Sequence, residues 1–583
     1  MEQYTNILKK HNINILNKTG DWFDNYLNYN LKRVGIEPTL ENKENYLSNK
    51  LNIEKDLDKL KGFDNVGNLI TEHINKNNFI LLVTDYDCDG INSAVLLTKF
   101  FRDILKYKNF ETMVNKRIDG NGFNKKLVSR IMEKYDSKKI DLIITADHGS
   151  SNNEEFKFFN LHGIDCCVTD HHEIPEELTA PKAFLNVMDN DSTYKKSTSG
   201  CTVAFLACLS TFKKLYPNES LIKLEPLLQY CAITTVVDYM DISNIDNRYL
   251  VKSGLNYINS TKDFNMNLYR LKSSGPHSYV FRDFGFTFGP FFNAGNRTSQ
   301  EEAVFNGFAS NDSLYAERNM LSCIVNNKNR KTNQKEAFEE ALKITEKMGI
   351  NEFTFGIAFY MNIAAGIAGP IANTVGDNYK RPTIVFRDGI KPGIIAGSGR
   401  GIIKNFDLLK TLLKIKEDRP EIIIYAGGHA GACGIEINSD YLEEFQKLFN
   451  EYVKIAVGGE IKPDILNVDG ILEPDDINAS VALKVEALGP YGNNWSEPIF
   501  ISELMITNLF FSSGGLFLKL SKDKNSENKD GRYWFGRDNG INKINFNEKL
   551  KVGKKCLVVY NVRLNYFQNT YSPLMDIIDI IPL

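Results

Sequence analysis

The sequence predicts an α/β protein of several domains that ends in a small all-β domain, and three patterns support this fold class. Apolar runs alternate with helical patterns through the first half of the chain, which is typical of a parallel sheet. A second alternation of this kind, rich in glycine at turn positions, begins near residue 348. After about residue 460, short apolar–polar alternations separated by turns favour a small β-barrel or sandwich.

The remaining regions are expected to be helical. The N-terminal region is polar with alternating charge, and a second charged stretch with a helical pattern separates the two α/β regions. The expected organisation is an N-terminal helical segment over 1–75, a first α/β domain over 76–300, connecting helices over 301–347, a second α/β domain over 348–458 and a barrel over 459–583.

Composition limits the class of protein. The formal net charge is -3, so no global basic excess indicates nucleic-acid binding, and a positive groove would have to be local. The nine cysteines include no CxxC pair, which argues against a zinc ribbon or a disulfide framework and favours a reducing compartment such as the cytoplasm. No apolar run is long enough for a membrane span, and the first residues lack the apolar core of a signal peptide.

Acidic and imidazole side chains follow four apolar runs, which we interpret as strands of the first sheet. The runs are FILLVTDYDCDG (79–90), IDLIITADHGSSN (140–152), IDCCVTDHHEIP (164–175) and CAITTVVDYMDI (231–242). In open parallel sheets, ligands gather outside the carboxyl ends of the strands. The four segments are therefore expected to converge on one site, although they lie far apart in sequence.

The segment DYDCDG is informative because it places three carboxylates close together. If the segment is extended, Asp85, Asp87 and Asp89 share one face, and three like charges repel one another unless cations neutralise them. Mg²⁺ and Mn²⁺ prefer oxygen ligands, and Mn²⁺ also accepts imidazole. The alternatives are a solvated acidic turn and a calcium loop, but a calcium loop needs a glutamate where this chain has Leu96.

Single aspartates and histidines give weaker signals. Asp147 and Asp238, taken alone, could be no more than structural residues such as helix caps. The adjacent pair His171 and His172 is more specific, because two histidines after a buried strand are uncommon. A lone histidine is usually a satisfied polar group, whereas clustered histidines favour metal ligation or acid–base chemistry.

Taken together, these segments resemble the DHH phosphoesterase superfamily. DYDCDG, TADHGSS, VTDHH and TTVVDYMD follow the order of its motifs, and IAAGIAGPIANTVGDNYKRPTIVF, GSGRG and YAGGHAGACG resemble the DHHA1 domain. NKRIDGNGFN, GPFFNAGNRTS and LGPYGNNWSEPIF are similar to the RecJ single-strand exonucleases, and the resemblance covers roughly residues 60 to 583. It implies a parallel-sheet DHH domain, connecting helices, a second α/β domain of the DHHA1 type and a C-terminal OB-like β-barrel.

The resemblance also implies a centre for two divalent ions, Mn²⁺ or Mg²⁺. The metal-binding residues it implies are Asp85, Asp87, Asp89, Asp147, His171 and Asp238. Asp147 would bridge the ions, and Asp85 would be either a ligand or an orienting group. Asp170 would orient a histidine, and His172 would be an orienting or acid–base partner, so that the expected catalytic residues are Asp147, Asp170 and His172.

Six further residues match positions at which the family contacts its substrate. They are Arg117, Arg297, Ser398, Arg400, Gly428 and His429. His429 would contact the scissile phosphate from the second α/β domain, across a cleft between the two domains. Arginine suits phosphate because its fork donates paired hydrogen bonds, although without the resemblance a surface ion pair is an equal alternative for each arginine, and turn chemistry is the alternative for the glycine.

The aromatic residues of the barrel are candidates for stacking on DNA bases, and barrel core is the alternative. They are Phe510, Phe511, Phe517, Tyr533, Trp534 and Phe535.

The chain departs from the family pattern at four positions. Val187 stands where a proline is usual, Asn296 replaces a glycine, Gly401 ends the GSGRG segment, and His148 follows Asp147 and could add a ligand or a base. These departures affect details of substrate contact rather than the metal site.

The expected function is that of a 5′→3′ exonuclease of single-stranded DNA in repair, recombination or replication. Such an enzyme releases 5′-mononucleotides and works with helicases and single-strand-binding proteins, without a membrane. One alternative is a phosphodiesterase of short oligoribonucleotides or cyclic dinucleotides, and another is an inactive scaffold. The barrel and the NAGNR segment favour the first function, and the intact acidic residues argue against a scaffold.

Overall fold

The computed structural model divides the chain into two compact units. The first unit contains residues 27–328 and 487–497, and the second contains 1–26, 329–486 and 498–583. The structure describes residues 4–16, 21–48, 57–120, 122–135, 139–174, 179–189, 197–275, 278–461, 465–512, 515–534, 550–567 and 570–583.

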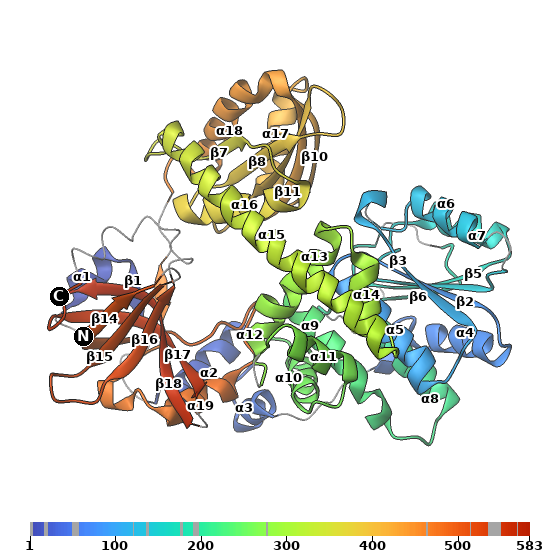
Figure 1. Ribbon diagram of the computed structural model, residues 1–583, viewed down its shortest axis with the longest axis horizontal. Helices are drawn as coiled ribbons and strands as arrows, with labels where there is room; N and C mark the ends of the chain where they lie inside the picture. The colour runs from blue at the N-terminus through green and yellow to red at the C-terminus, as the bar shows by residue number, and fades with distance from the viewer. Residues whose placement is uncertain are drawn as a thin grey trace. The chain divides into compact units, whose positions relative to one another are not determined.

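A five-stranded parallel sheet is the centre of the first unit (Figure 1). In spatial order its strands are β3 (Phe110–Val114), β2 (Ile80–Thr84), β4 (Leu142–Ala146), β5 (Asp165–Asp170) and β6 (Ala183–Asn186). All neighbouring pairs run parallel, which confirms the sequence prediction. The chain enters the sheet at β2 and places β3 on one side of it and β4 on the other. The direction in which strands are added therefore reverses between β2 and β4. In such sheets this switch point is where ligands bind.

Helices bury both faces of this sheet, which explains why β2 and β4 are buried at every residue and mostly apolar rather than alternating. One face packs in a core cluster against α6 and α7 through side chains such as Leu127 and Phe156. The other face carries α5 and α8, and α4 packs beside α8. These helices are α4 (Phe63–Asn75), α5 (Cys88–Lys99), α6 (Lys125–Lys134), α7 (Asn153–Leu161) and α8 (Gly200–Leu215).

A layer of helices follows the sheet, and it corrects one sequence prediction. The apolar run around 231–242 is not a strand, because Leu228–Val237 forms helix α9. This helix packs against α5, α8 and α10. Because a helix buried on several sides has no polar face, its sequence is a continuous apolar run like that of a buried strand. The helices of the layer are α9, α10 (Ile245–Asn259), α11 (Phe264–Lys272), α12 (Phe281–Asp283), α13 (Gly289–Arg297), α14 (Glu301–Ala309) and α15 (Ser313–Met348).

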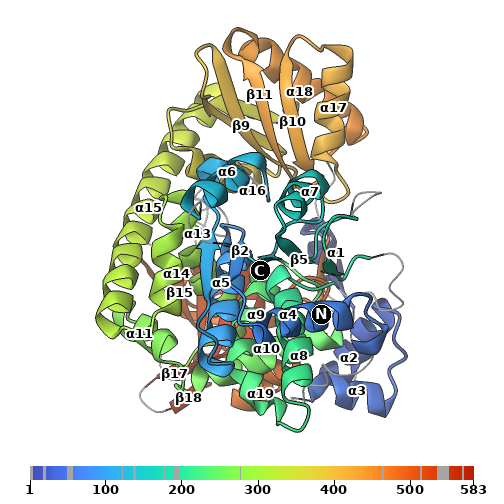
Figure 2. The same cartoon turned by 90° about the vertical axis from the view of Figure 1, so that its right-hand side faces the viewer.

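The second unit contains another five-stranded sheet, which is mixed. Its spatial order is β10 (Ile423–His429), β11 (Ala432–Asn438), β9 (Ile394–Arg400), β8 (Thr383–Asp388) and β7 (Ile357–Tyr360), and only β7 and β8 are parallel. Figure 2 shows α17 (Leu408–Asp418) and α18 (Leu442–Ala456) beside this sheet. They cover one face through a core cluster, whereas α16 (Ala365–Tyr379) packs with β7 and β8 in a separate cluster.

The C-terminal strands form the small barrel that the sequence predicts. They are β14 (Phe500–Phe511), β15 (Gly515–Ser521), β16 (Lys529–Trp534), β18 (Thr570–Pro582) and β17 (Lys555–Phe567), in spatial order, and a pairing between β17 and β14 closes the ring. The short strands β1 (Ile13–Ile15) and β12 (Leu466–Val468) pair parallel beside it, and β13 (Gly470–Ile471) pairs with β14. The other helices are α1 (Thr5–Lys10), α2 (Trp22–Arg33), α3 (Leu40–Leu47) and α19 (Ala479–Leu488).

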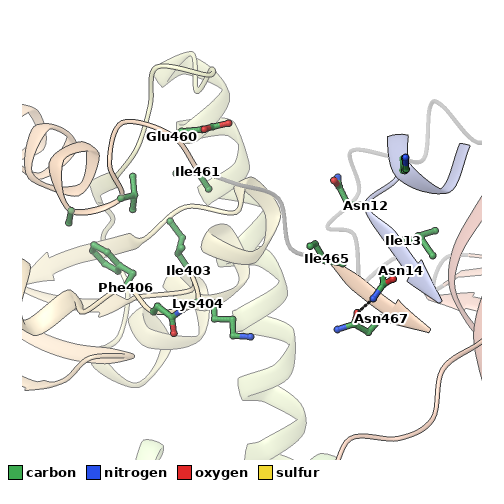
Figure 3. Close-up of a pocket in the computed structure, with 14 residues that line it drawn as sticks. Asn12, Ile13, Asn14, Ile403, Lys404, Phe406, Glu460, Ile461, Ile465 and Asn467 are labelled. Atoms are coloured by element: carbon green, nitrogen blue, oxygen red, sulfur yellow. Dashed lines mark hydrogen bonds between the residues drawn. The ribbon is translucent and has the colours of Figure 1, made fainter. Parts of the chain in front are cut away.

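The second unit also has an open pocket of about 950 Å³ (Figure 3). Lys404 and Phe406 line one side of it, and Asn14 and Asn467 line the other, where the Asn14 amide donates a hydrogen bond of 3.0 Å to Asn467. None of the residues that the sequence predicts for the site lines this pocket. Within the described part of the chain, every helix is too short or too polar to cross a membrane.

Candidate metal centre and nucleic-acid-binding residues

The loop after β2 turns directly into helix α5, so the DYDCDG segment is not extended and its three carboxylates do not share one face of a strand. The Asp87 carboxylate caps the helix by accepting the backbone N–H groups of Asp89 (2.9 Å) and Gly90 (3.1 Å). Gly90 lies against the preceding loop, where a Cβ atom would meet the Asp85 carbonyl oxygen at 2.2 Å. The final glycine of the motif is therefore what allows the loop to fold back over the first turn of the helix.

Asp89 points from the first turn of α5 to the N-terminus of another helix. Its two carboxylate oxygens accept the backbone N–H groups of Gly200 (2.6 Å) and Cys201 (2.9 Å), the first residues of α8. The positive end of that helix stabilises the charge of the buried carboxylate. Burial nevertheless raises the pKa of Asp89 above its usual value, although the neighbouring His171 opposes the rise.

Asp147 follows β4 in a left-handed backbone conformation, with φ at 65°. This conformation is uncommon outside glycine, although aspartate tolerates it better than most residues, and it tends to occur at functional sites. The side chain is buried against the start of α8, where a Cβ atom on Gly200 would lie 2.5 Å from Asp147 Oδ1. The close approach explains why α8 begins with glycine.

The ring of His171 brings the carboxylates together. Its Nδ1 lies 2.9 Å from the Thr198 carbonyl oxygen, and because a carbonyl can only accept, Nδ1 carries the proton. Nε2 is then an unprotonated donor atom for a metal ion. It lies 3.1 Å from Asp147 Oδ1, 3.7 Å from Asp89 Oδ2 and 3.7 Å from Asp238 Oδ2.

Asp170 organises the residues behind this centre. It accepts the backbone N–H of Ser150 at 2.9 Å and the Nδ1–H of His172 at 2.8 Å. Burial raises the pKa of Asp170, but the charge of His172, the hydrogen bonds from Ser150 and, above all, the hydrogen bond from His172 together hold the pKa well below the usual range. The same hydrogen bond raises the pKa of His172 to about 9. Asp170 and His172 thus form an ion pair beside the metal candidates.

Burial and crowding raise the pKa values of the carboxylates in this centre. Burial, together with the charges of Asp89 and Asp87, raises the pKa of Asp238 to about 8. Burial and Asp87 raise the pKa of Asp85 to about 7, and the pKa of Asp147 rises well above its usual value from burial and from the same neighbours. Such shifts by burial and like charge are typical of functional sites, and a divalent cation would reverse them.

The structure thus brings together four of the six predicted metal ligands in sets of close donor atoms. Asp89, His171 and Asp238 form one set, and Asp147, His171 and His172 form the other. Asp85 and Asp87 stand beside these sets without joining them, and one oxygen of Asp85 is buried without a hydrogen-bond partner in the described structure.

His148 joins neither set. Its Nε2 lies 3.1 Å from the Val83 carbonyl oxygen, and its ring packs edge-on against Phe123, which indicates a role in positioning the loop.

Arg117 is linked to the metal-binding loop through helix α13. Its guanidinium donates to Asn296 Oδ1 (3.4 Å), and the Asn296 amide donates to Asn293 Oδ1 (3.5 Å). Asn293 Oδ1 also accepts the backbone N–H of Cys88 at 3.1 Å. Arg297, the other predicted phosphate ligand of this unit, is the last residue of the same helix. Sequence reasoning missed Asn293, although its spacing of three residues from Asn296 on a helix places the two on one side.

The remaining phosphate candidates lie in the second unit on strands β9 and β10. Ser398 pairs with Gly434 and Arg400 with Ala432 across to β11, and Ala432 in turn pairs with His429 on β10. Arg400 is half-buried, burial lowers its pKa, and the one hydrogen bond that its guanidinium makes within the described structure is to the carbonyl of Gly399. A half-buried guanidinium without a carboxylate partner is suited to an anionic ligand.

The GGH segment before the β10–β11 turn has a defined geometry. Gly428 has φ at 137°, and a Cβ atom there would meet the Ala432 carbonyl oxygen at 2.4 Å. The Gly431 backbone N–H donates to His429 Nδ1 at 3.2 Å, so the neutral ring carries its proton on Nε2. His429 is exposed, so its ring is accessible to solvent and Nε2–H is available as a hydrogen-bond donor.

The barrel aromatics divide into exposed and core residues. Phe510 is 59% exposed and stacks on Phe517 with ring centroids 5.2 Å apart. The guanidinium of Arg532, which sequence reasoning missed, lies over the rings of Phe517 (5.0 Å) and Trp534 (4.8 Å). Tyr533 belongs to the core. Phe511 is exposed at the end of β14, and Phe535 lies outside the described residues.

Comparisons with known protein families identify three domains along the chain. Residues 79–233 match the N-terminal domain of the DHH family, residues 354–455 match the DHHA1 domain and residues 468–579 match the RecJ OB domain.

Individual proteins share this organisation. The chain is 28% identical over 459 residues to the single-stranded-DNA-specific exonuclease RecJ of Haemophilus influenzae, covering 77% of this chain and 78% of the relative. It is 27% identical over 458 residues to the protein of that name from Escherichia coli, covering 76% and 78%. Its fold is similar to the crystal structure of RecJ in complex with Mn²⁺ from Thermus thermophilus, with a TM-score of 0.73, 18% identity and coverage of 97% of this chain and 78% of that chain.

Proposed function

Because the chain belongs to the DHH family and joins its DHH domain to a DHHA1 domain and a RecJ-type OB domain, we propose that it is a metal-dependent exonuclease. It removes 5′-mononucleotides stepwise from the 5′ end of single-stranded DNA, the substrate stated in the names of its relatives. The convergence of three carboxylates on Nε2 of His171 carries this proposal.

The donor set fits two Mn²⁺ or Mg²⁺ ions. Oxygen ligands with one imidazole are what these cations accept, and the raised pKa values are those of carboxylates that lack a neutralising partner. The residues that would hold the ions are Asp89, Asp147, His171 and Asp238, whose donor atoms lie close together, with Asp87 beside them. Asp85 would be a further ligand or an orienting group. When bound, such ions activate a water molecule and stabilise charge on the attacking and leaving oxygens.

The chain's own groups orient this centre and move a proton. The Thr198 carbonyl fixes the ring of His171 so that Nε2 faces the carboxylates. Asp170 holds Nδ1 of His172 and keeps that ring protonated at neutral pH, since the pKa of His172 is raised to about 9. His172 can then donate the Nε2 proton to a departing oxygen.

Each unit by itself offers donors for phosphate groups of the strand. Arg117 and Arg297 bind phosphate near the metal-binding loop, and Ser398 and Arg400 provide a hydroxyl and a guanidinium on the DHHA1 sheet. His429, beside Gly428, donates its Nε2–H to an oxygen of the scissile phosphate. The barrel extends the contact with DNA, because exposed Phe510 and its neighbours can stack bases.

The cellular setting forms part of this proposal. A nuclease specific for single strands depends on helicases and single-strand-binding proteins to present its substrate, so we propose these as partners in DNA repair, recombination or replication. All nine cysteines are free, which agrees with a reducing compartment such as the cytoplasm.

A substrate panel tests the proposal. The full chain is incubated with Mn²⁺ and labelled single-stranded DNA, duplex DNA, short RNA or a cyclic dinucleotide, beside the variant Asp147→Ala. Mononucleotide release from single-stranded DNA, absent in the variant, is the expected result. Cleavage of only the short RNA or the cyclic dinucleotide would indicate the alternative phosphodiesterase, and no cleavage of any substrate would indicate a scaffold.

A further inference from the structure

One face of the DHHA1 sheet carries a strip of small residues between the predicted phosphate-binding side chains. Gly427 on β10 pairs with Gly434 on β11, which pairs with Ser398 on β9. Directly paired residues of antiparallel strands point to the same side, so these three residues share one face. Gly434 is exposed, whereas Ile435 and Cys433 on the opposite side belong to the domain core.

An exposed tyrosine forms one end of this strip. Tyr425 lies two residues before Gly427 on the same face and is 55% exposed. A Cβ atom on Gly427 would meet the Tyr425 hydroxyl oxygen at 2.2 Å, which places the ring along β10 over Gly427, in the direction of His429. The ring therefore occupies the space that a side chain at position 427 would fill.

The surface next to the tyrosine ring is open. A Cβ atom on Gly434 would meet nothing closer than 4.0 Å, so the strip is flat and accessible there. His429 lies about 7 Å beyond Gly427 along the strand, a separation of nucleotide size. Its Nε2–H and the guanidinium of Arg400 supply donors for a phosphate at that end.

We infer that Tyr425, with the open floor at Gly434 beside its ring, is a binding site for a nucleobase of the DNA strand. A flat floor beside an aromatic ring accepts the π-face of any base, and the adjacent donors select a ligand that carries a phosphate. The inference rests on the proposed function and deepens it, because it assigns to the DHHA1 domain a contact with a base as well as with phosphate.

Binding measured without hydrolysis tests the inference. A 5′-phosphorylated, 3′-fluorescein oligothymidine is titrated with the full chain in EDTA, and anisotropy reports the dissociation constant. Tyr425→Ala is expected to weaken binding about 5- to 100-fold, the range for loss of one stacked base, whereas Tyr425→Phe binds as wild type. Phe353→Ala, which removes another exposed aromatic residue of the same domain, is the matched control and leaves binding unchanged.

Abasic oligonucleotides identify the contact. An abasic residue is placed at the first, second or third position from the 5′ end, and at one of these positions wild type and Tyr425→Ala are expected to bind equally. Unchanged binding by Tyr425→Ala on normal DNA overturns the inference, as does an equal loss at all three abasic positions. A chain that shows the expected binding but releases no nucleotide with Mn²⁺ contradicts the nuclease proposal alone.

Discussion

The substitution Gly200→Ala adds a single methyl group to the metal centre. Gly200 opens helix α8 with ordinary helical geometry, so alanine suits its backbone and would by itself favour the helix by about 0.5–1 kcal/mol. Its Cβ atom, however, would lie 2.5 Å from Asp147 Oδ1 and 2.8 Å from the Asp147 Cα atom, where ordinary contact begins at 3.4 Å. The carboxylate therefore has to retreat by about 0.9 Å, and part of that movement falls on the backbone.

A displacement of this size has two consequences. Misplacing a catalytic group by about 1 Å costs roughly a hundredfold in rate, or about 2.7 kcal/mol, so nucleotide release in Mn²⁺ should fall by about that factor. Overpacking a buried site typically costs about 1–3 kcal/mol, which exceeds the gain in helix propensity and should lower the unfolding temperature.

The assay follows 5′-mononucleotide release from labelled single-stranded DNA over a range of Mn²⁺ concentrations, with thermal unfolding measured alongside. Gly285→Ala is the matched control, because its added Cβ atom meets only a Val236 methyl at 3.8 Å, an ordinary contact, in the same helical layer. If Gly200→Ala releases nucleotides at the wild-type rate and binds Mn²⁺ with wild-type affinity, the position of Asp147 against the start of α8 does not matter for the reaction, and the reasoning is refuted.

Three further predictions concern the same chemistry. Asp147→Ala should abolish nucleotide release without unfolding the chain, because relief of like-charge crowding offsets the cost of the left-handed backbone, and circular dichroism with the release assay checks both parts. His429→Ala should lower kcat about a hundredfold with little change in unfolding temperature, since the exposed ring supports no core; a normal kcat would remove His429 from the reaction. The metal-free chain should lose stability as the pH rises. The pKa values of Asp85 and Asp238, about 7 and about 8, exceed the ordinary value of 3.8. Their stabilising contribution is therefore complete only below about pH 4, decreases as the pH rises from there, and is lost once the pH has passed 7 to 8. Unfolding temperatures in EDTA between about pH 6 and pH 9 would show this decline, which Asp238→Asn should reduce and saturating Mn²⁺ should remove.

Much of the metal centre was predictable because parallel strands bring their carboxyl ends to one edge. Asp147 and Asp170 each stand at the end of an apolar run, and strands β4 and β5 pair in register, so the convergence of their loops needs no knowledge of the helices. The barrel was predictable for a similar reason, since alternation along its strands records which face is buried.

Other features depend on contacts between distant parts of the chain. The carboxylate of Asp89 is oriented by the backbone N–H groups of residues 200 and 201, which are more than a hundred positions away. No local sequence pattern predicts that contact. Helix α9 is buried against three other helices, so its sequence loses the polar face that distinguishes a surface helix from a strand. The stacking of Arg532 on Phe517 depends on the register between β15 and β16, which the sequence does not specify.

The unusual backbone at position 147 has a practical consequence for capturing the protein with an uncut strand. Alanine would remove the carboxylate, but it would be strained in a left-handed backbone conformation that favours glycine, asparagine and aspartate. Asparagine keeps both the shape of the side chain and the turn, and removes only the charge. Asp147→Asn is thus the variant best suited to holding an intact oligonucleotide for crystallography.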